Sequence, residues 1–363
     1  MHHLKSILFI CFFAFLAATL NASEFDIHRG TNISHFLSQS DHRGLQRSNY
    51  LKKEELSQLS KWGFDHIRLP IDEVQMWDED GQFNNEGLSL LHQTIHWCME
   101  LNLKVIVDLH ILRSHSFNDT TNTLWNSVLE QNKLVNLWTQ LSTELKKYPT
   151  KMVAYELLNE PVAPTDDDWN KILNRIIARI RIQEPKRFLV IGSNKWQGVD
   201  TMDKLVLPEN DRNLILSFHF YTPHLLTHYR TSWTNLASIT TPICYPYNIT
   251  DKDFEKMSPK DKELVYPFKG VRNKEVLRTE FLKAVQASAK WKLPIYCGEF
   301  GCFKTIDDDC RMNWYKDVVG LMTEYKIPFA NWDYKGGFGF VGKKGLLSEP
   351  QLLEILTTNK IVK

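Results

Sequence analysis

The sequence predicts an α/β fold, a (β/α)8 TIM barrel, in a single domain with a long loop insertion after the sixth strand. Eight short runs rich in β-branched and aromatic residues alternate with helical patterns. These runs are nearly continuous in hydrophobicity, which is typical of parallel strands covered by helices. Eight strands is the number that closes a barrel. An open doubly wound sheet competes, but residues 29–34 hold one glycine where that fold needs a glycine-rich phosphate turn.

The expected elements can be placed in order along the chain. The strands cover residues 25–33, 66–70, 104–110, 152–159, 188–192, 214–221, 295–299 and 329–332. Helices are expected over residues 54–62, 91–101, 134–145, 172–180, 274–290, 311–324 and 349–357, where apolar residues recur mainly at i, i+3, i+4 and i+7. Residues 222–270 are too many for an ordinary connection, so we expect a rim loop or small subdomain there, with a disordered insertion as the alternative.

The first 22 residues predict a secretory signal peptide. A short basic start precedes an apolar run from Ile7 to Leu20, and Ala22 is a small residue suited to cleavage. The run is too short to span a bilayer, and no later segment is long and apolar enough, so we expect no membrane insertion. A membrane anchor is the alternative. Residues 23–363 are then one folded domain, secreted to an extracellular or periplasmic location.

Charge and cysteine content limit the classes of partner, disulfide and metal site that we expect. The chain has 44 Lys and Arg against 43 Asp and Glu, so nothing favours nucleic acid or an anionic membrane. After removal of the signal peptide an odd number of cysteines remains, which leaves a free thiol in the monomer that we expect. The sequence has no C-x-x-C pair, which argues against structural zinc. Cys302 and Cys310 either form a disulfide or both stay reduced.

Polar residues follow most of the expected strands. In a barrel, the carboxyl ends of the strands form one face, and the active site lies there. Six of the eight ends carry such residues, which are Arg68, Asp108, His110, Asn159, Glu160, His219, Tyr221, Glu299, Trp332 and Asp333. Glu160 and Glu299 follow apolar strands far apart in sequence. Two such carboxylates are the minimum equipment for cleaving a glycosidic bond, one as acid and base and the other as nucleophile.

Residue parity adds detail to this face. His219 and Tyr221 are two residues apart and point to the same side of their strand, as do Asp108 and His110. Asn159 and Glu160 are adjacent, so both can reach one cleft only if the strand bends or ends there. The following Pro161 fits such an ending.

These residues resemble glycoside hydrolase family 5, a family of retaining β-glycanases on (β/α)8 barrels. The resemblance covers essentially residues 23–363 and rests on Asn159-Glu160-Pro161 and on Gly298-Glu299-Phe300-Gly301 in this order. It implies that Glu160 is the acid/base and Glu299 the nucleophile. The other family positions are also filled, by Arg68, His110, His219, Tyr221 and Trp332.

The chemistry of each side chain fits the implied roles. Arg68 and the Tyr221 hydroxyl can hold Glu299 ionised, and Asn159 can bind the sugar 2-hydroxyl. The two histidines can bind sugar hydroxyls or tune Glu160, and Trp332 offers an apolar face to the sugar ring. Each also has a structural reading, such as a buried Arg–Glu pair or a core tryptophan. Further subsites or plain packing are open for Trp77, Trp125, Trp196 and Trp233, while a structural role is expected for Asp72, Asp108 and Asp333.

The resemblance implies a polysaccharide or oligosaccharide substrate, no cofactor and no metal. An endo-β-1,4-glucanase is favoured by its frequency in the family, while mannan, xyloglucan, chitosan, β-1,3-linked or mixed-linkage glucans and exo action remain open. One alternative is a metal-dependent hydrolase that uses Asp108, His110, His219, Glu299 and Asp333, but the first strand lacks a His-x-His pair. Another is a carbohydrate-binding protein without catalysis, although both carboxylates are present.

Overall fold

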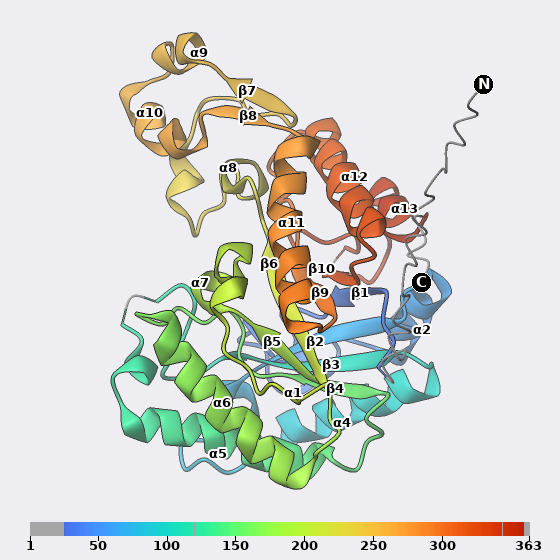
Figure 1. Cartoon of the computed structure of the whole chain (residues 1–363). Helices are drawn as coiled ribbons and strands as arrows, with labels where there is room; N and C mark the ends of the chain where they lie inside the picture. The colour runs from blue at the N-terminus through green and yellow to red at the C-terminus, as the bar shows by residue number, and fades with distance from the viewer. Residues whose placement is uncertain (1–24, 120, 343, 359–363) are drawn as a thin grey trace, which may run out of the picture.

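A closed barrel of eight parallel strands forms the centre of the molecule (Figure 1). The computed structural model describes residues 25–119, 121–342 and 344–358, so the expected signal peptide lies outside the described residues. In barrel order the strands are β1 (Arg29–Asn32), β2 (His66–Asp72), β3 (Lys104–Ile111), β4 (Val153–Glu156), β5 (Leu189–Gly192), β6 (Leu214–Phe220), β9 (Ile295–Phe300) and β10 (Phe329–Asn331). The predicted (β/α)8 barrel is confirmed.

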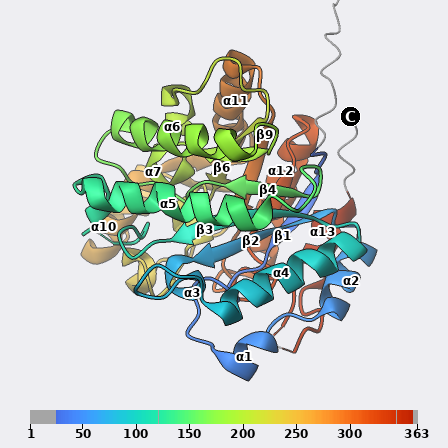
Figure 2. The ribbon, with the colours of Figure 1, turned by 90° about the horizontal axis from the view of Figure 1, so that it is seen from below.

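Helices surround the barrel, as the two perpendicular views show (Figures 1 and 2). The long ones are α2 (Lys53–Lys61), α4 (Asn85–Glu100), α5 (Val128–Leu145), α6 (Asp166–Gln183), α11 (Lys274–Trp291), α12 (Asp308–Glu324) and α13 (Pro350–Thr358). Their apolar stripes face the sheet. In α5 the residues with helical spacing, Leu134, Leu137, Trp138, Leu141 and Leu145, are all buried. Short helices α1 (Gly44–Ser48), α3 (Glu73–Met76) and α7 (Asn194–Gln197) lie in the connections.

The inside of the barrel changes from apolar to polar along the strands. One cluster of buried side chains, near the strands' amino ends, contains Phe25, Ile27, Ile106, Ala154, Phe188, Val190, Ile215, Tyr296 and Ala330. Two residues further along their strands, the positions with the same orientation are Asp108, Glu156 and Ser217. Arg68 of β2 reaches these carboxylates. The apolar layer therefore supports a charged layer, which in turn lies beneath the mouth of the barrel.

The insertion after β6 is an ordered subdomain. It contains α8 (His224–Thr227), β7 (Tyr247–Ile249), α9 (Asp251–Glu255), α10 (Pro259–Val265) and β8 (Gly270–Arg272). Strands β7 and β8 pair antiparallel and form a sheet separate from the barrel. In Figure 1 the insertion stands above the barrel, on the side where β6 ends. This outcome agrees with the expected small subdomain and not with a disordered insertion.

A disulfide ties the insertion to the barrel's outer layer. Cys244 of the insertion is bonded to Cys310 in the first turn of α12. The expectation that Cys302 either pairs with Cys310 or leaves it reduced is therefore wrong. Cys302 is fully buried, and its backbone N–H donates to the Tyr315 hydroxyl, so its thiol lies in the core. Within the described part of the chain, no helix has the length and apolar character needed to cross a bilayer.

Candidate active site

Glu299 reaches the barrel mouth because β9 carries a bulge. Phe218 of β6 pairs with Cys297 and the next residue, His219, pairs with Glu299, so Gly298 is an extra residue. Without that bulge, Glu299 would share the outward orientation of Cys297. The glycine is needed because a Cβ there would lie 2.9 Å from the Ser217 hydroxyl. The bulge thus turns the carboxylate inward.

Glu160 lies beyond the end of a strand. Strand β4 ends at Glu156, so Asn159 and Glu160 lie in the loop that follows. Neither residue belongs to a regular strand, so the alternation of side-chain directions along a strand does not apply to them. Glu160 has a left-handed backbone with φ 46°, and its N–H donates to the Gln197 side chain at 2.8 Å. Glu160 and Glu299 are both buried and line the same cavity.

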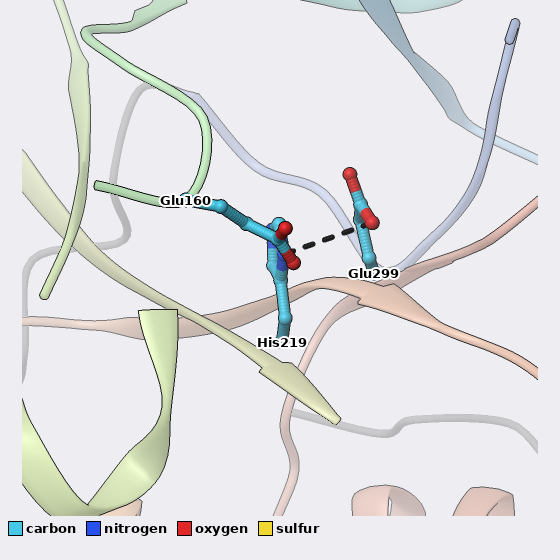
Figure 3. A group of neighbouring side chains, drawn as sticks. All are labelled: Glu160, His219 and Glu299. Carbon is cyan, nitrogen blue, oxygen red and sulfur yellow. Dashed lines mark hydrogen bonds and ion pairs between the residues drawn. The ribbon is translucent and has the colours of Figure 1, made fainter. Parts of the chain in front are cut away.

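The two glutamates meet at His219. Glu160 Oε1 lies 2.8 Å from His219 Nδ1, and Glu299 Oε2 lies 3.6 Å from the same nitrogen. One carboxylate oxygen from each glutamate and one His219 nitrogen all lie within 4.8 Å of one another (Figure 3). In Figure 3, Glu160 extends from the loop after β4 toward His219, and Glu299 stands beside it on β9.

These three groups are also close enough to bind a metal ion. They form the only such group found among residues 25–119, 121–342 and 344–358. Arg68 opposes that use, because its Nη1 lies 2.6 Å from Glu299 Oε1 and would place a fixed positive charge beside the cation. The other proposed metal ligands, Asp108, His110 and Asp333, do not belong to the group.

Arg68 is the charged centre beneath the site. It contacts Glu299 as predicted, but it also pairs with Glu156 at 2.7 Å and with Asp108 at 3.0 Å. All four side chains are buried. One guanidinium thus serves three carboxylates, so part of this negative charge must be compensated by protons.

The proton balance of the two glutamates follows from their partners. Burial raises the pKa of Glu160 well above its usual range, and the neighbouring Glu299 charge raises it further. Burial also raises the pKa of Glu299, but Arg68 and the Tyr221 hydroxyl, 2.9 Å from Oε2, favour its ionised form. Glu160 therefore binds a proton more strongly than Glu299 does, and Glu299 is the first of the two to ionise. His219 is neutral, because burial and the positive charge of Arg68 lower its pKa.

Three of the residues predicted to bind the substrate or support the glutamates have a buried polar atom without a partner. These atoms are His110 Nε2, His219 Nε2 and Asn159 Nδ2. The opposite end of each side chain is occupied: His110 Nδ1 lies 2.7 Å from Asp108 Oδ2, and Asn159 Oδ1 accepts from Arg68 at 2.8 Å. Buried polar groups normally have partners, so the unpaired His110 and Asn159 atoms are suited to bind a polar ligand.

Trp332 forms part of the cavity wall but is less exposed than expected. Only 8% of its surface is exposed, because its ring stacks on His110 with centroids 5.5 Å apart and an interplanar angle of 5°. It still lines the cavity, whose volume is about 860 Å³. Of the four other tryptophans, Trp196 and Trp233 line this cavity and are each 52% exposed. Neither Trp77 nor Trp125 lines it, so for these two the packing reading is correct.

Sequence reasoning missed three supporting residues. Glu156 and Gln197 are described above, and Asn32 accepts from Arg68 at 2.9 Å and donates to the Gly298 carbonyl at 2.9 Å. Glu156 could have been found from inward parity in an otherwise apolar strand. No local pattern marks Gln197, which reaches the site from a turn after β5.

Comparisons with known proteins agree with this geometry. The family model described as cellulase, glycosyl hydrolase family 5, matches residues 23–337. Endoglucanase C of Acetivibrio thermocellus is 31% identical over 84% of this chain and 90% of its own length. Cellodextrinase A of Ruminococcus flavefaciens is 27% identical over 83% of each chain.

Solved structures that are similar to this chain have the same fold. A structure of endoglucanase Cel5A from Thermotoga maritima has a TM-score of 0.73 and 25% identity, covering 92% of this chain and 98% of its own. Structures of that enzyme are described with cellobiose and with mannotriose. By family match, relatives and barrel, the chain belongs to the cellulase family, glycosyl hydrolase family 5, and is a glycosidase.

Proposed function

We propose that the protein is a secreted, retaining endo-β-1,4-glucanase in which Glu160 is the acid/base and Glu299 the nucleophile. The observation that carries the mechanism is the close approach of the two carboxylates, with oxygens within 4.8 Å at the barrel mouth. Retaining pairs lie about 5–5.5 Å apart, whereas inverting pairs need about 6.5–9.5 Å to admit a water molecule. The spacing here supports direct attack on the sugar.

The first step uses the different proton states of the pair. Glu299, held ionised by Arg68 and Tyr221, attacks the anomeric carbon as the glycosidic bond breaks. Glu160 gives its proton to the departing oxygen, which leaves as the new hydroxyl end of the cleaved chain. The product is a covalent glycosyl ester on Glu299.

The second step reverses these roles. Ionised Glu160 takes a proton from a water molecule, and the water oxygen attacks the anomeric carbon. The bond to Glu299 breaks and its carboxylate is restored. Two inversions give net retention. Asn159 Nδ2, buried and unpaired, is suited to bind the sugar 2-hydroxyl, a contact that strengthens in the transition state.

The choice of a β-1,4-glucan follows the relatives. An endoglucanase is 31% identical across most of both chains. The cavity is lined from several loops, including those with His35, Phe117, Trp196, Trp233 and Phe338, which suits a chain of several sugars more than one sugar. A cellodextrinase among the relatives makes exo action on short glucans the second candidate. Product sizes from cellulose and cellohexaose distinguish the two.

Azide rescue tests the assignment of the glutamates. Glu299→Gly removes the nucleophile and leaves space, so azide should attack an activated β-glycoside once and give the α-glycosyl azide. Glu160→Ala keeps the nucleophile but gives the leaving group no proton. A substrate with a good leaving group should still form the intermediate, and azide should intercept it to give the β-glycosyl azide.

Proton NMR of the two products reads the anomeric configuration. Reversed configurations would mean that the roles of Glu160 and Glu299 are exchanged. If both variants are folded and azide rescues neither, the covalent mechanism is wrong.

Export is part of the proposal. Residues 1–22 would direct the chain out of the cytoplasm, and the Cys244–Cys310 disulfide supports this, because such bonds persist in oxidising compartments. The amino terminus of protein recovered outside the cytoplasm should then be residue 23. An uncleaved amino terminus there would contradict the proposal.

A further inference from the structure

We propose that Gln197 is a positioning residue that holds the acid/base Glu160 in its working orientation. This inference rests on the proposed role of Glu160. Gln197 is fully buried, and its side-chain oxygen accepts the Glu160 N–H at 2.8 Å. Its amide nitrogen donates to Glu156 at 3.1 Å and to the Ser217 hydroxyl at 3.2 Å. Both ends of the amide are thus occupied.

Glu160 needs such a partner because its backbone is strained. A left-handed conformation is unfavourable for a residue with a Cβ, and Glu160 has φ 46°. Its N–H lies in the buried interior of the site, where an unpaired donor would be costly. The Gln197 contact satisfies the donor and opposes relaxation of the backbone. The direction in which the Glu160 carboxyl leaves the chain depends on that backbone.

The backbone around Gln197 has a shape that accommodates its side chain. Lys195, Trp196 and Gln197 are three consecutive residues with positive φ, between 52° and 60°. Such a run is unfavourable unless surrounding contacts impose it. A Cβ at Gly192 would lie 2.3 Å from Gln197 side-chain atoms, so the glycine leaves space for them. The turn and the glycine together bring the amide beneath Glu160.

The contacts also connect the two proposed catalytic carboxylates. Glu156, which accepts from Gln197, is held by Arg68, and Arg68 also holds Glu299. A continuous series of buried polar contacts thus runs from Glu299 through Arg68, Glu156 and Gln197 to the Glu160 backbone. It fixes the acid/base relative to the nucleophile through the barrel interior.

Leaving-group dependence separates positioning of an acid from general structural support. The measurement is kcat/KM for a dinitrophenyl and a phenyl β-glycoside of a disaccharide that the wild-type enzyme cleaves. The first needs little protonation on departure, and the second needs it fully. Gln197→Met, similar in volume but unable to form either contact, should lose about 10- to 100-fold on the phenyl substrate and less than about 3-fold on the dinitrophenyl one.

Gln197→Glu is the conservative variant. It keeps an oxygen for the Glu160 N–H, and its buried carboxyl, protonated beside Glu156, offers an O–H donor in place of the amide N–H. It should therefore restore much of the activity on the phenyl substrate. It also keeps the test informative if Gln197→Met does not fold.

Asn194→Ala is the matched control in the same turn. Asn194 is also buried and accepts a backbone N–H at 2.8 Å, but from Ala163 and not from Glu160. Any loss in this variant should be equal for the two substrates. Equal losses in Gln197→Met would overturn the inference, as would full activity on the phenyl substrate.

Glu160→Gln distinguishes the two levels of the argument. Its loss should depend strongly on the leaving group if Glu160 is the acid. If it does and that of Gln197→Met does not, only the role of Gln197 is wrong. If Glu160→Gln itself shows no such dependence, the assignment of Glu160 is wrong.

Discussion

Arg68 illustrates how much one residue can carry that its immediate sequence does not reveal. Its contact with Glu299 could be predicted, because both residues stand at strand ends on one face of a barrel. Its pairs with Glu156 and Asp108 lie one layer deeper. Removing one member of a buried ion pair commonly destabilises the folded protein strongly, because the remaining charge stays buried without compensation. Arg68→Ala would therefore disturb three carboxylates together, and a milder change is needed to isolate its effect on Glu299.

Arg68→Lys should move the acidic limb of the kcat/KM profile to higher pH by about one unit. An ammonium is a point charge and cannot contact Glu299, Glu156 and Asp108 as the guanidinium does. Weaker stabilisation of the Glu299 carboxylate raises its pKa, so the proposed nucleophile ionises at higher pH.

Tyr221→Phe is the companion variant, since it removes only the hydroxyl that donates to Glu299. The acidic limb of its kcat/KM profile should also move to higher pH, by less than that of Arg68→Lys. If neither limb moves, other groups hold Glu299 ionised.

At the scale of elements, the sequence predicted which strands and long helices exist better than it predicted their local irregularities. All eight strands and the long helices follow from hydrophobic periodicity, because each buries one face or stripe. The bulge at Gly298 and the left-handed turn at residues 195–197 depend on close contacts with other strands. Gly298 must avoid Ser217, and Gln197 must reach Glu156 and Ser217, which are contacts between segments far apart in sequence. A local pattern cannot encode them.

The insertion shows the same limit, since its covalent partner was mispredicted. Cys302 is nearer to Cys310 in sequence than Cys244 is, but the folded insertion brings Cys244 to α12 across 66 positions.

Closing a loop of that length typically stabilises a fold by about 2–4 kcal/mol. Cys244→Ser should therefore lower the free energy of unfolding by about that amount, measured by denaturant titration. Dithiothreitol should lower the Tm of the wild-type protein and leave that of the Cys244→Ser/Cys310→Ser variant unchanged. A wild-type Tm that stays constant after confirmed reduction of the bond would contradict this expectation.

At the scale of the whole molecule, the barrel separates stability from chemistry along its axis. The apolar layer around Ile106 and Tyr296 closes the core, the Arg68 layer sets charge, and the mouth holds the two proposed catalytic carboxylates. The sequence predicted the mouth because parallel strands bring their carboxyl ends together whatever their separation in the chain. It could not predict the shape of the cavity above them, which depends on loops. Trp332 lines the cavity as expected, but its ring stacks on His110 and is more covered than predicted.

The insertion extends the cavity with Trp233, and this gives a prediction about substrate length. Its indole is 52% exposed, lines the cavity, and packs edge-on against Phe303 with centroids 5.1 Å apart. Because the indole is fixed by this contact and about half exposed, it is suited to stack on a sugar remote from the cleavage point. Burial of that face should contribute about 1–2 kcal/mol, so Trp233→Ala should lower kcat/KM for cellohexaose by about tenfold. A short aryl cellobioside, which reaches fewer subsites, should be affected much less.

Tyr266→Ala is the matched control for Trp233→Ala. Tyr266 is 67% exposed in the same insertion and does not line the cavity, so its loss should leave both substrates unaffected. Equal effects of Trp233→Ala on long and short substrates would place the indole at the reacting sugar. No effect on either would make it a packing residue of the insertion. A selective loss on the long substrate requires that the sugar chain extends from the glutamate pair to the insertion, and hence that the inserted residues help to set the length of glucan that the barrel binds.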